Sequence, residues 1–219
     1  MTQVQAVIFD MDGTLFQTDK ILELALDDTF AFLRSEHGWS GETPIHTYRK
    51  IMGVTLQVVW ETLLPGRSDE LRNIANEFFH AKLIANIRSG NGALYPHVYE
   101  VLDGLKQAGR RIFIASNGRL DYLSAIVGYY GLERWLTETF SIQQIDSQDK
   151  TDLVRHIMNK YGIVQAAVVG DRLSDIRAAK NNGLTAVGCR FDFAQEDELA
   201  QADAVIDDLL ELNTVFNLR

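Results

Sequence analysis

Four short runs of apolar and β-branched residues predict buried strands. They cover residues 4–9, 111–115, 166–170 and 184–188, and runs this short are more typical of strands than of helices. Between the later runs, apolar side chains recur at helical spacing instead, as in Val98, Val101, Leu102 and Leu105 after Pro96, and in Leu153, Val154, Ile157, Met158 and Tyr161. This alternation predicts an α/β protein with a Rossmann-like parallel sheet.

The segment 17–92 departs from that alternation, because it carries helical periodicity only. One helical stripe relates Leu22, Ala25, Thr29 and Leu33, and a second relates Leu71, Ala75, Phe78, Ala81 and Ile84. We expect this segment to begin near residues 17–19 and to end in the glycine-containing loop 89–92. We expect residues 1–16 and 93–219 to form the core domain, and 17–92 to form an inserted helical cap domain.

Composition narrows the classes of protein and of partner. A chain of 219 residues with 46% hydrophobic side chains can bury a core and hold an insertion. The net charge of −9, with no Lys/Arg cluster, disfavours nucleic acid as a partner. Cys189 is the single cysteine, so no intrachain disulfide forms, which fits a reducing, cytoplasmic location. The absence of a signal sequence and of an apolar run of about 18 residues disfavours secretion and membrane spanning.

Two carboxylates follow the first predicted strand, in Asp10-Met11-Asp12-Gly13-Thr14. The carboxyl ends of parallel strands are where open α/β sheets bind ligands. Alternation along an extended chain directs Asp10 and Asp12 to the same side, and Gly13 permits a sharp turn after them. Taken locally, Asp12-Gly13 is equally typical of a two-residue hairpin turn.

The second predicted strand ends in Ser116-Asn117-Gly118. A hydroxyl and backbone N–H groups beside a helix N-terminus form a cradle for an anion. Locally, Ser116 is an equally good N-cap for a helix that begins at Arg119.

Lys150 begins the predicted helix 150–161, an end at which the helix dipole disfavours a cation. An anionic group is expected nearby, and Asp149 or Asp152 alone can supply it. After the strand 166–170, Asp171 leaves the strand and Asp175 falls in the first turn of the next helix. Three strands thus deliver polar residues suited to phosphate at one edge of the sheet.

These residues resemble, in order, the four motifs of the haloacid-dehalogenase-like hydrolase superfamily. The matched positions are Asp10-x-Asp12-Gly13-Thr14, Ser116-Asn117, Lys150 and Gly170-Asp171-x3-Asp175. The helical insertion directly after the first motif is similar to the phosphoglycolate-phosphatase and β-phosphoglucomutase branch. One departure is Thr151, because many relatives have proline after the lysine.

The resemblance implies magnesium-dependent hydrolysis of a small phosphorylated metabolite, a phosphate monoester, through an aspartyl phosphate on Asp10. It implies that Asp12 is the general acid and then the base, and that Lys150 offsets charge. Substrate binding falls to Thr14, Ser116 and Asn117, and Mg²⁺ is held by Asp10, the main-chain carbonyl of Asp12, Asp171 and Asp175. The insertion is expected to be a mobile lid.

Three alternatives to this activity have some support in the sequence. A phosphosugar mutase needs residues in the insertion that retain a phosphorylated intermediate, and Arg67-Ser68 is the nearest candidate. A dehalogenase does not need the second carboxylate, yet Asp12 is present. A non-catalytic binding or regulatory module predicts loss of a motif residue, and none is missing. Thr47, Arg49, Lys50 and Gly53 are candidate substrate contacts, although each is more typical of ordinary surface. The sequence does not predict the oligomeric state.

Overall fold

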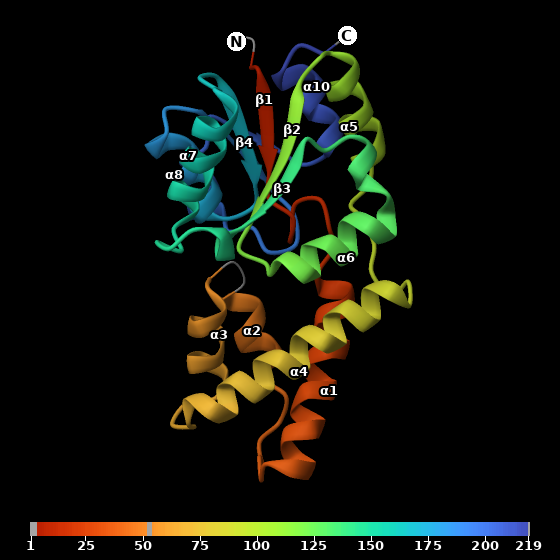
Figure 1. Ribbon diagram of the computed structural model, residues 1–219, viewed down its shortest axis with the longest axis vertical. Helices are drawn as coiled ribbons and strands as arrows, with labels where there is room; N and C mark the ends of the chain where they lie inside the picture. Colours follow the sequence, from red (N-terminus) through yellow and green to blue (C-terminus); the bar gives the residue numbers. More distant parts are fainter. Residues whose placement is uncertain (1–3, 52–53, 219) are drawn as a thin grey trace. The chain divides into compact units, whose positions relative to one another are not determined.

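The computed structural model describes residues 4–51 and 54–218. The chain divides into two compact units, of which one contains Met1–Gln17 and Leu94–Arg219 and the other Thr18–Ala93. The first is an α/β core and the second is helical (Figure 1). The predicted fold class, a parallel α/β core with an inserted helical segment, is confirmed. Among the helices of the described chain, none has the length and apolar character needed to cross a membrane.

A parallel sheet organises the core unit. Over the described residues its six strands are arranged in the order β3-β2-β1-β4-β5-β6. Their bounds are β1 Ala6–Phe9, β2 Arg111–Ser116, β3 Glu138–Ser141, β4 Ala166–Gly170, β5 Thr185–Cys189 and β6 Ala204–Ile206. Phe9, the last residue of β1, lies opposite Ile114 and Val169. The residue that follows β1 therefore emerges at the carboxyl edge, between β2 and β4.

The four predicted strands correspond to β1, β2, β4 and β5, with boundaries shifted by two residues or fewer. The strands β3 and β6 were not predicted. Both are short edge strands, and β3 reads Glu-Thr-Phe-Ser, with a single apolar residue. The strand β3 therefore has little apolar character, whereas β6 is apolar, Ala-Val-Ile, but with three residues is too short for a periodic signal.

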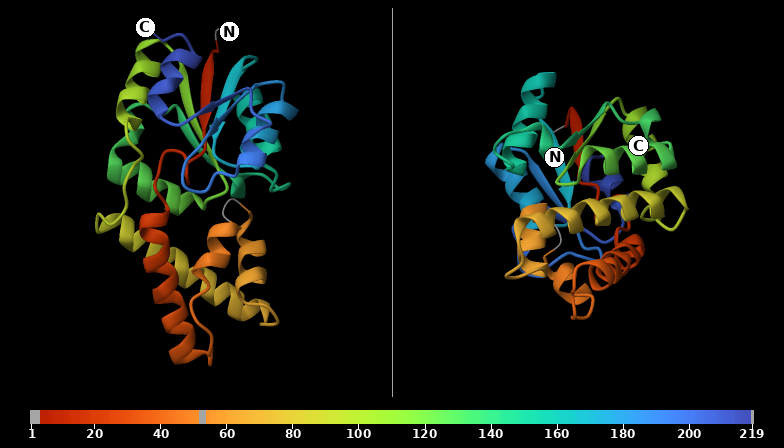
Figure 2. Two further views of the ribbon diagram at one scale, coloured as in Figure 1. Left: turned by 180° about the vertical axis from the view of Figure 1, so that it is seen from behind. Right: turned by 60° about the horizontal axis from the view of Figure 1, so that its bottom comes forward.

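Helices cover both faces of the sheet (Figures 1 and 2). One face carries α7 (Lys150–Tyr161) and α8 (Leu173–Asn181), whose apolar residues join Ile8, Phe113 and Val168 in one buried cluster. The other face carries α5 (Val98–Gln107), α6 (Leu120–Tyr130) and α10 (Leu212–Val215). Burial on both faces explains the continuous apolar runs of the inner strands. The shorter elements are η1 Leu132–Arg134, η2 Ile142–Gln144, α9 Glu196–Leu199 and η3 Leu209–Glu211.

The inserted unit contains α1 (Asp19–Glu36), α2 (Ile45–Lys50), α3 (Leu56–Leu63) and α4 (Asp69–Arg88). The long helices α1 and α4 pack together, and the rings of Phe32 and Phe78 stack at 4.4 Å between centroids. The predicted stripe on α4 was wrong by about one residue. Its buried positions are Ala75, Phe79, His80, Leu83 and Ile87, whereas Ala81 is exposed. The candidate contact Gly53 lies outside the described residues.

The two chain segments that lead to and from the insertion are bonded to each other within the core unit. The Gln17 side-chain amide donates to the carbonyl of Leu94 at 2.6 Å, and the Tyr95 N–H donates to the carbonyl of Leu15 at 3.0 Å. An antiparallel bridge also joins Phe16 to Leu94. The core therefore closes on itself where the insertion departs.

Because this junction is internal to the core, we expect the core to fold without the insertion. Residues 18–93 would be replaced by a short Gly/Ser linker from Gln17 to Leu94. The expected product is a monodisperse α/β protein that unfolds cooperatively in urea, as followed by circular dichroism. A soluble product without a cooperative transition would contradict the independence of the core.

Candidate active site

Asp10 directly follows the central strand β1. Its backbone N–H donates to the carbonyl of Val169 at 2.9 Å, which extends the ladder with β4 by one residue. Its side chain is almost fully buried. Both neighbours of β1 are parallel, so the hairpin alternative for Asp12-Gly13 is wrong. Gly13, at φ +77°, instead makes a tight turn in which its N–H donates to the carbonyl of Phe16.

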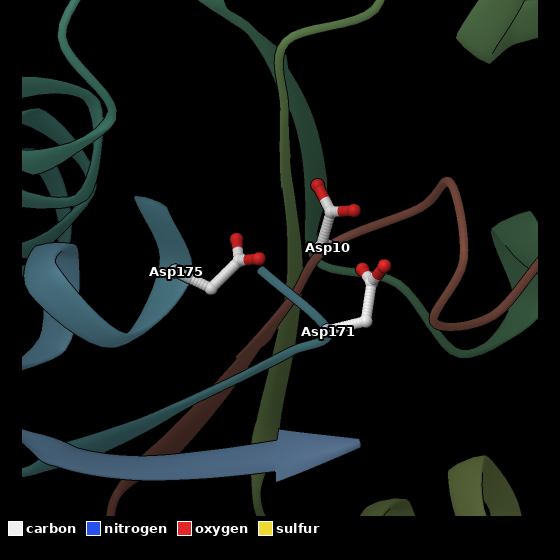
Figure 3. A group of neighbouring side chains, drawn as sticks. All are labelled: Asp10, Asp171 and Asp175. Atoms are coloured by element: carbon white, nitrogen blue, oxygen red, sulfur yellow. The ribbon is translucent and has the colours of Figure 1, made fainter. Parts of the chain in front are cut away.

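Three buried carboxylates meet at the carboxyl edge of the sheet. Asp10, Asp171 and Asp175 come from the end of β1, the end of β4 and the first turn of α8, and their carboxylates converge (Figure 3). Each offers one oxygen that lies within 4.8 Å of the other two. In the described part of the chain, Asp171 Oδ2 is buried and accepts no hydrogen bond. An all-oxygen set with an unsatisfied buried oxygen suits a hard divalent cation.

Two glycines make this close approach of the carboxylates possible. A Cβ atom built on Gly13 would lie 2.5 Å from Asp171 Oδ2, and one on Gly170 would lie 2.2 Å from Asp175 Cγ. Asp175 is further fixed because its Oδ2 accepts from the Arg172 N–H at 3.1 Å. Residues without a side chain thus reserve the space into which the carboxylates fit.

Lys150 is buried between two of these carboxylates. Its ammonium forms ion pairs with Asp10 and, at 2.5 Å, with Asp175. The alternative partners predicted from the sequence are engaged elsewhere, because Asp149 accepts from the Thr151 N–H and Asp152 pairs with Arg155. The anionic group that compensates the lysine at this helix end is therefore the carboxylate cluster itself.

Burial and like charge shift the ionisation of the cluster. Burial raises the pKa of Asp10 to about 7, the ammonium of Lys150 opposes this shift, and the carboxylates of Asp175 and Asp12 add to it. Burial, followed by Asp10 and Asp175, also raises the pKa of Asp171. Burial disfavours the charged Lys150, but attraction to Asp10 and Asp175 outweighs it and raises the lysine pKa. The cluster therefore favours a proton or a bound cation at neutral pH.

The three residues predicted to bind substrate have different surroundings. Thr14 is fully buried, and its hydroxyl donates to Asp171 Oδ1 at 3.1 Å. Ser116 is buried and its Oγ accepts from the Gly118 N–H at 3.0 Å. The helix α6 begins at Leu120 with Arg119 at its N-cap, so the alternative of Ser116 as the cap is wrong. Asn117 is half-buried beside Ser116.

The sequence interpretation missed Tyr122. This residue lies in the first turn of α6, is almost fully buried, and its hydroxyl donates to Asp12 Oδ1 at 2.5 Å. Along the chain, Tyr122 belongs to an ordinary buried stripe with Leu123 and Ile126. Only the three-dimensional structure distinguishes it from a core residue.

The chain belongs to the haloacid dehalogenase-like hydrolase family, whose model matches residues 4–183. It is 28% identical to a phosphoglycolate phosphatase of Agrobacterium fabrum, over 94% of this chain and 89% of the relative. It is 24% identical to protein CbbY of Cereibacter sphaeroides, over 98% and 96%. The fold matches that of a predicted phosphoglycolate phosphatase from Haemophilus somnus with a TM-score of 0.87 at 21% identity, covering 98% and 99% of the two chains. The chain is therefore a hydrolase with phosphatases among its relatives.

Substitution Gly170→Ala tests the packing of the cluster. The added methyl group has to displace Asp175, so we expect affinity for a divalent cation to fall about 10- to 100-fold, as measured by calorimetry. Gly104→Ala is the matched control, because its new methyl group would meet only Asn213, at 3.6 Å. Equal cation affinity in the two variants would show that Asp175 does not depend on Gly170.

Proposed function

We propose that the chain hydrolyses a small phosphate monoester in a magnesium-dependent reaction through an aspartyl phosphate on Asp10. One observation carries this proposal: a buried lysine is paired with Asp10 and Asp175 in a cluster of three carboxylates at the carboxyl edge of the sheet. This cluster combines a carboxylate nucleophile, a fixed positive charge and ligands for a cation. Family membership supports the same chemistry.

In the first step, a carboxylate oxygen of Asp10 attacks phosphorus and the ester P–O bond breaks. Asp12 gives its proton to the departing oxygen, which leaves as an alcohol. In the second step, Asp12 takes a proton from water, and the resulting hydroxide displaces phosphate from Asp10. A positioned acid or base of this kind contributes roughly 10²–10⁴-fold to a rate.

The remaining residues stabilise charge. Lys150, Ser116 and the backbone N–H groups beside Ser116 would neutralise and hold phosphoryl oxygens, with Asn117 beside them. Asp10, the main-chain carbonyl of Asp12, Asp171 and Asp175 would hold Mg²⁺, which supplies positive charge against the phosphoryl group. Thr14 supports this set through its hydrogen bond to Asp171.

Charge explains the requirement for a cation. The four aspartates contribute about −4, a bound phosphate ester adds about −2, and Lys150 returns +1. A sum near −5 repels the substrate. Burial is the largest cause of the raised pKa values of Asp10 and Asp171, and like charge among the aspartates adds to it. A divalent cation in the cluster would offset part of this negative charge and so reduce the repulsion of the substrate.

The structure favours hydrolysis over the mutase alternative. Ser68 is the N-cap of α4 and accepts from the Leu71 N–H, while the Arg67 guanidinium lies 5.5 Å from the ring centroid of Trp39. Both residues thus have structural contacts inside the inserted unit. A non-catalytic module is disfavoured because the aspartates and Lys150 are assembled together.

Asp10→Asn is expected to lower turnover of a small phosphate ester on the order of 10⁴-fold or more, with the fold retained. Asp152→Asn is the matched control, because Asp152 pairs with Arg155 at the surface. Near wild-type phosphate release by Asp10→Asn would refute Asp10 as the nucleophile.

Chelator should abolish wild-type turnover and Mg²⁺ should restore it, whereas Ca²⁺ should support turnover poorly because of its looser coordination.

We further propose that the insertion, Thr18–Ala93, acts as a lid and restricts the substrate to small metabolites. The entry to the insertion follows soon after Asp10 and Asp12, and its exit at Leu94 is hydrogen-bonded to Gln17 at that entry. Thr47, Arg49 and Lys50 are exposed candidates for substrate contact, and Arg49 pairs with Glu23. Names of relatives make phosphoglycolate the first substrate to test.

For the lid, the measurement is kcat/KM for phosphoglycolate, a hexose phosphate, a nucleotide and a phosphopeptide. Closure that excludes water leaves little room for a protein chain, so we expect the small esters to exceed the phosphopeptide by at least about 100-fold. Hydrolysis of the phosphopeptide at the rate of the small esters would contradict a closing lid.

A further inference from the structure

Tyr122 connects α6 to the proposed acid and base. Its phenol hydroxyl donates to Asp12 Oδ1 at 2.5 Å, and only 3% of the residue is exposed. Asp12 itself is half-buried and lies on the loop after β1. Its side chain is not one of the three carboxylates of the cluster. The contact therefore joins a helix on one face of the sheet to a loop at its carboxyl edge.

The position of Tyr122 is fixed by its surroundings. A Cβ built on Gly118 would lie 3.2 Å from Tyr122 Cδ1, so the ring packs closely against the backbone at Gly118. That backbone is held in turn, since the Ser141 hydroxyl donates to the Gly118 carbonyl at 2.6 Å. The Leu120 N–H donates to the Gln143 side chain at the start of α6. The phenol is thus a rigid donor.

A hydrogen bond from a rigid donor to one oxygen of a carboxyl group fixes the orientation of the second oxygen of that group. Proton transfer to a leaving oxygen needs the carboxyl group within hydrogen-bond reach and in the right orientation. A displacement of about 1 Å in such a group can lower a rate about 100-fold. A side chain on a loop requires an external contact to be held this closely.

We propose that Tyr122 is a positioning residue that orients Asp12 for proton transfer to the leaving group, an inference that rests on the proposed function. The phenol keeps its own proton throughout. Asp12 gives its proton to the departing oxygen as the P–O bond breaks, and later receives one from water. Tyr122 acts only through the direction in which Asp12 holds that proton.

Leaving groups separate this role from a structural one. An alkyl phosphate needs a proton on its departing oxygen, whereas p-nitrophenolate departs as a stable anion. For Tyr122→Phe we expect kcat/KM to fall about tenfold or more for phosphoglycolate or glycerol phosphate, and less than about threefold for p-nitrophenyl phosphate. With the aryl ester, the second step should still become slower, because Asp12 has to take a proton from water in that step. kcat and KM should then fall together, and kcat/KM should change little.

Tyr130→Phe is the matched control on the same helix. Among the described residues its hydroxyl is buried and has no hydrogen-bond partner, so both esters should react at wild-type rates. In an Asp12→Asn background, Tyr122→Phe should cause no further loss on the alkyl ester, because the residue it positions has been removed. Thermal midpoints of all variants would be measured alongside.

An equal fall of kcat/KM for both esters in Tyr122→Phe, or no fall for either, would overturn the inference. An additional loss in the Asp12→Asn background would overturn it as well. Failure of the proposed function is distinguishable, because it appears as a wild-type protein that hydrolyses neither ester or as an active Asp10→Asn variant.

Discussion

The ammonium of Lys150, buried with the carboxylates of Asp10 and Asp175, is the interaction on which the site depends. Three carboxylates in the interior repel one another, and burial alone disfavours their charged forms. Lys150 compensates part of that charge from within the chain, and the negative charge that remains favours the binding of a cation. Electrostatics thus links the first turn of α7 to the end of β1 and to the first turn of α8.

Parallel topology makes this arrangement possible. Asp10 and Lys150 are 140 positions apart, yet crossover helices return each strand in the same direction, so all carboxyl ends lie at one edge. The central strand β1 supplies Asp10, the proposed nucleophile, and the flanking strands β2 and β4 fix the end of β1 on both sides. Glycines at 13 and 170 leave room for the carboxylates, and Thr14 and Arg172 hold them by hydrogen bonds.

Long-range order limits what the sequence can predict. The inner strands and the helices α5 and α7 were predictable, because each has a strong local signal of apolar run or helical period. The roles of the motif residues stay a prediction that rests on their spacing. The edge strand β3 has little apolar character and β6 has only three residues, so both depend on pairing with a neighbouring strand. The buried face of α4 is chosen by packing against α1. The contact of Tyr122 with Asp12 spans 110 positions and leaves no local signal. The partners of Lys150 also could not be predicted from the sequence, because the nearby Asp149 and Asp152 offered a sufficient local explanation for a cation at this helix end. Only the structure shows that Lys150 pairs with Asp10 and Asp175.

The bonded junction at Gln17 and Leu94 has a consequence for how such a protein diverges. A segment whose two ends are neighbours can lengthen, shrink or be exchanged by recombination without moving the core strands. The entropic cost of closing a loop rises slowly, by about 0.6 kcal/mol of free energy for each doubling of the loop's length. Selection can therefore alter the inserted helices almost independently of the aspartates. With the insertion in its proposed role as a lid, new substrates are explored while the residues of the core are inherited unchanged.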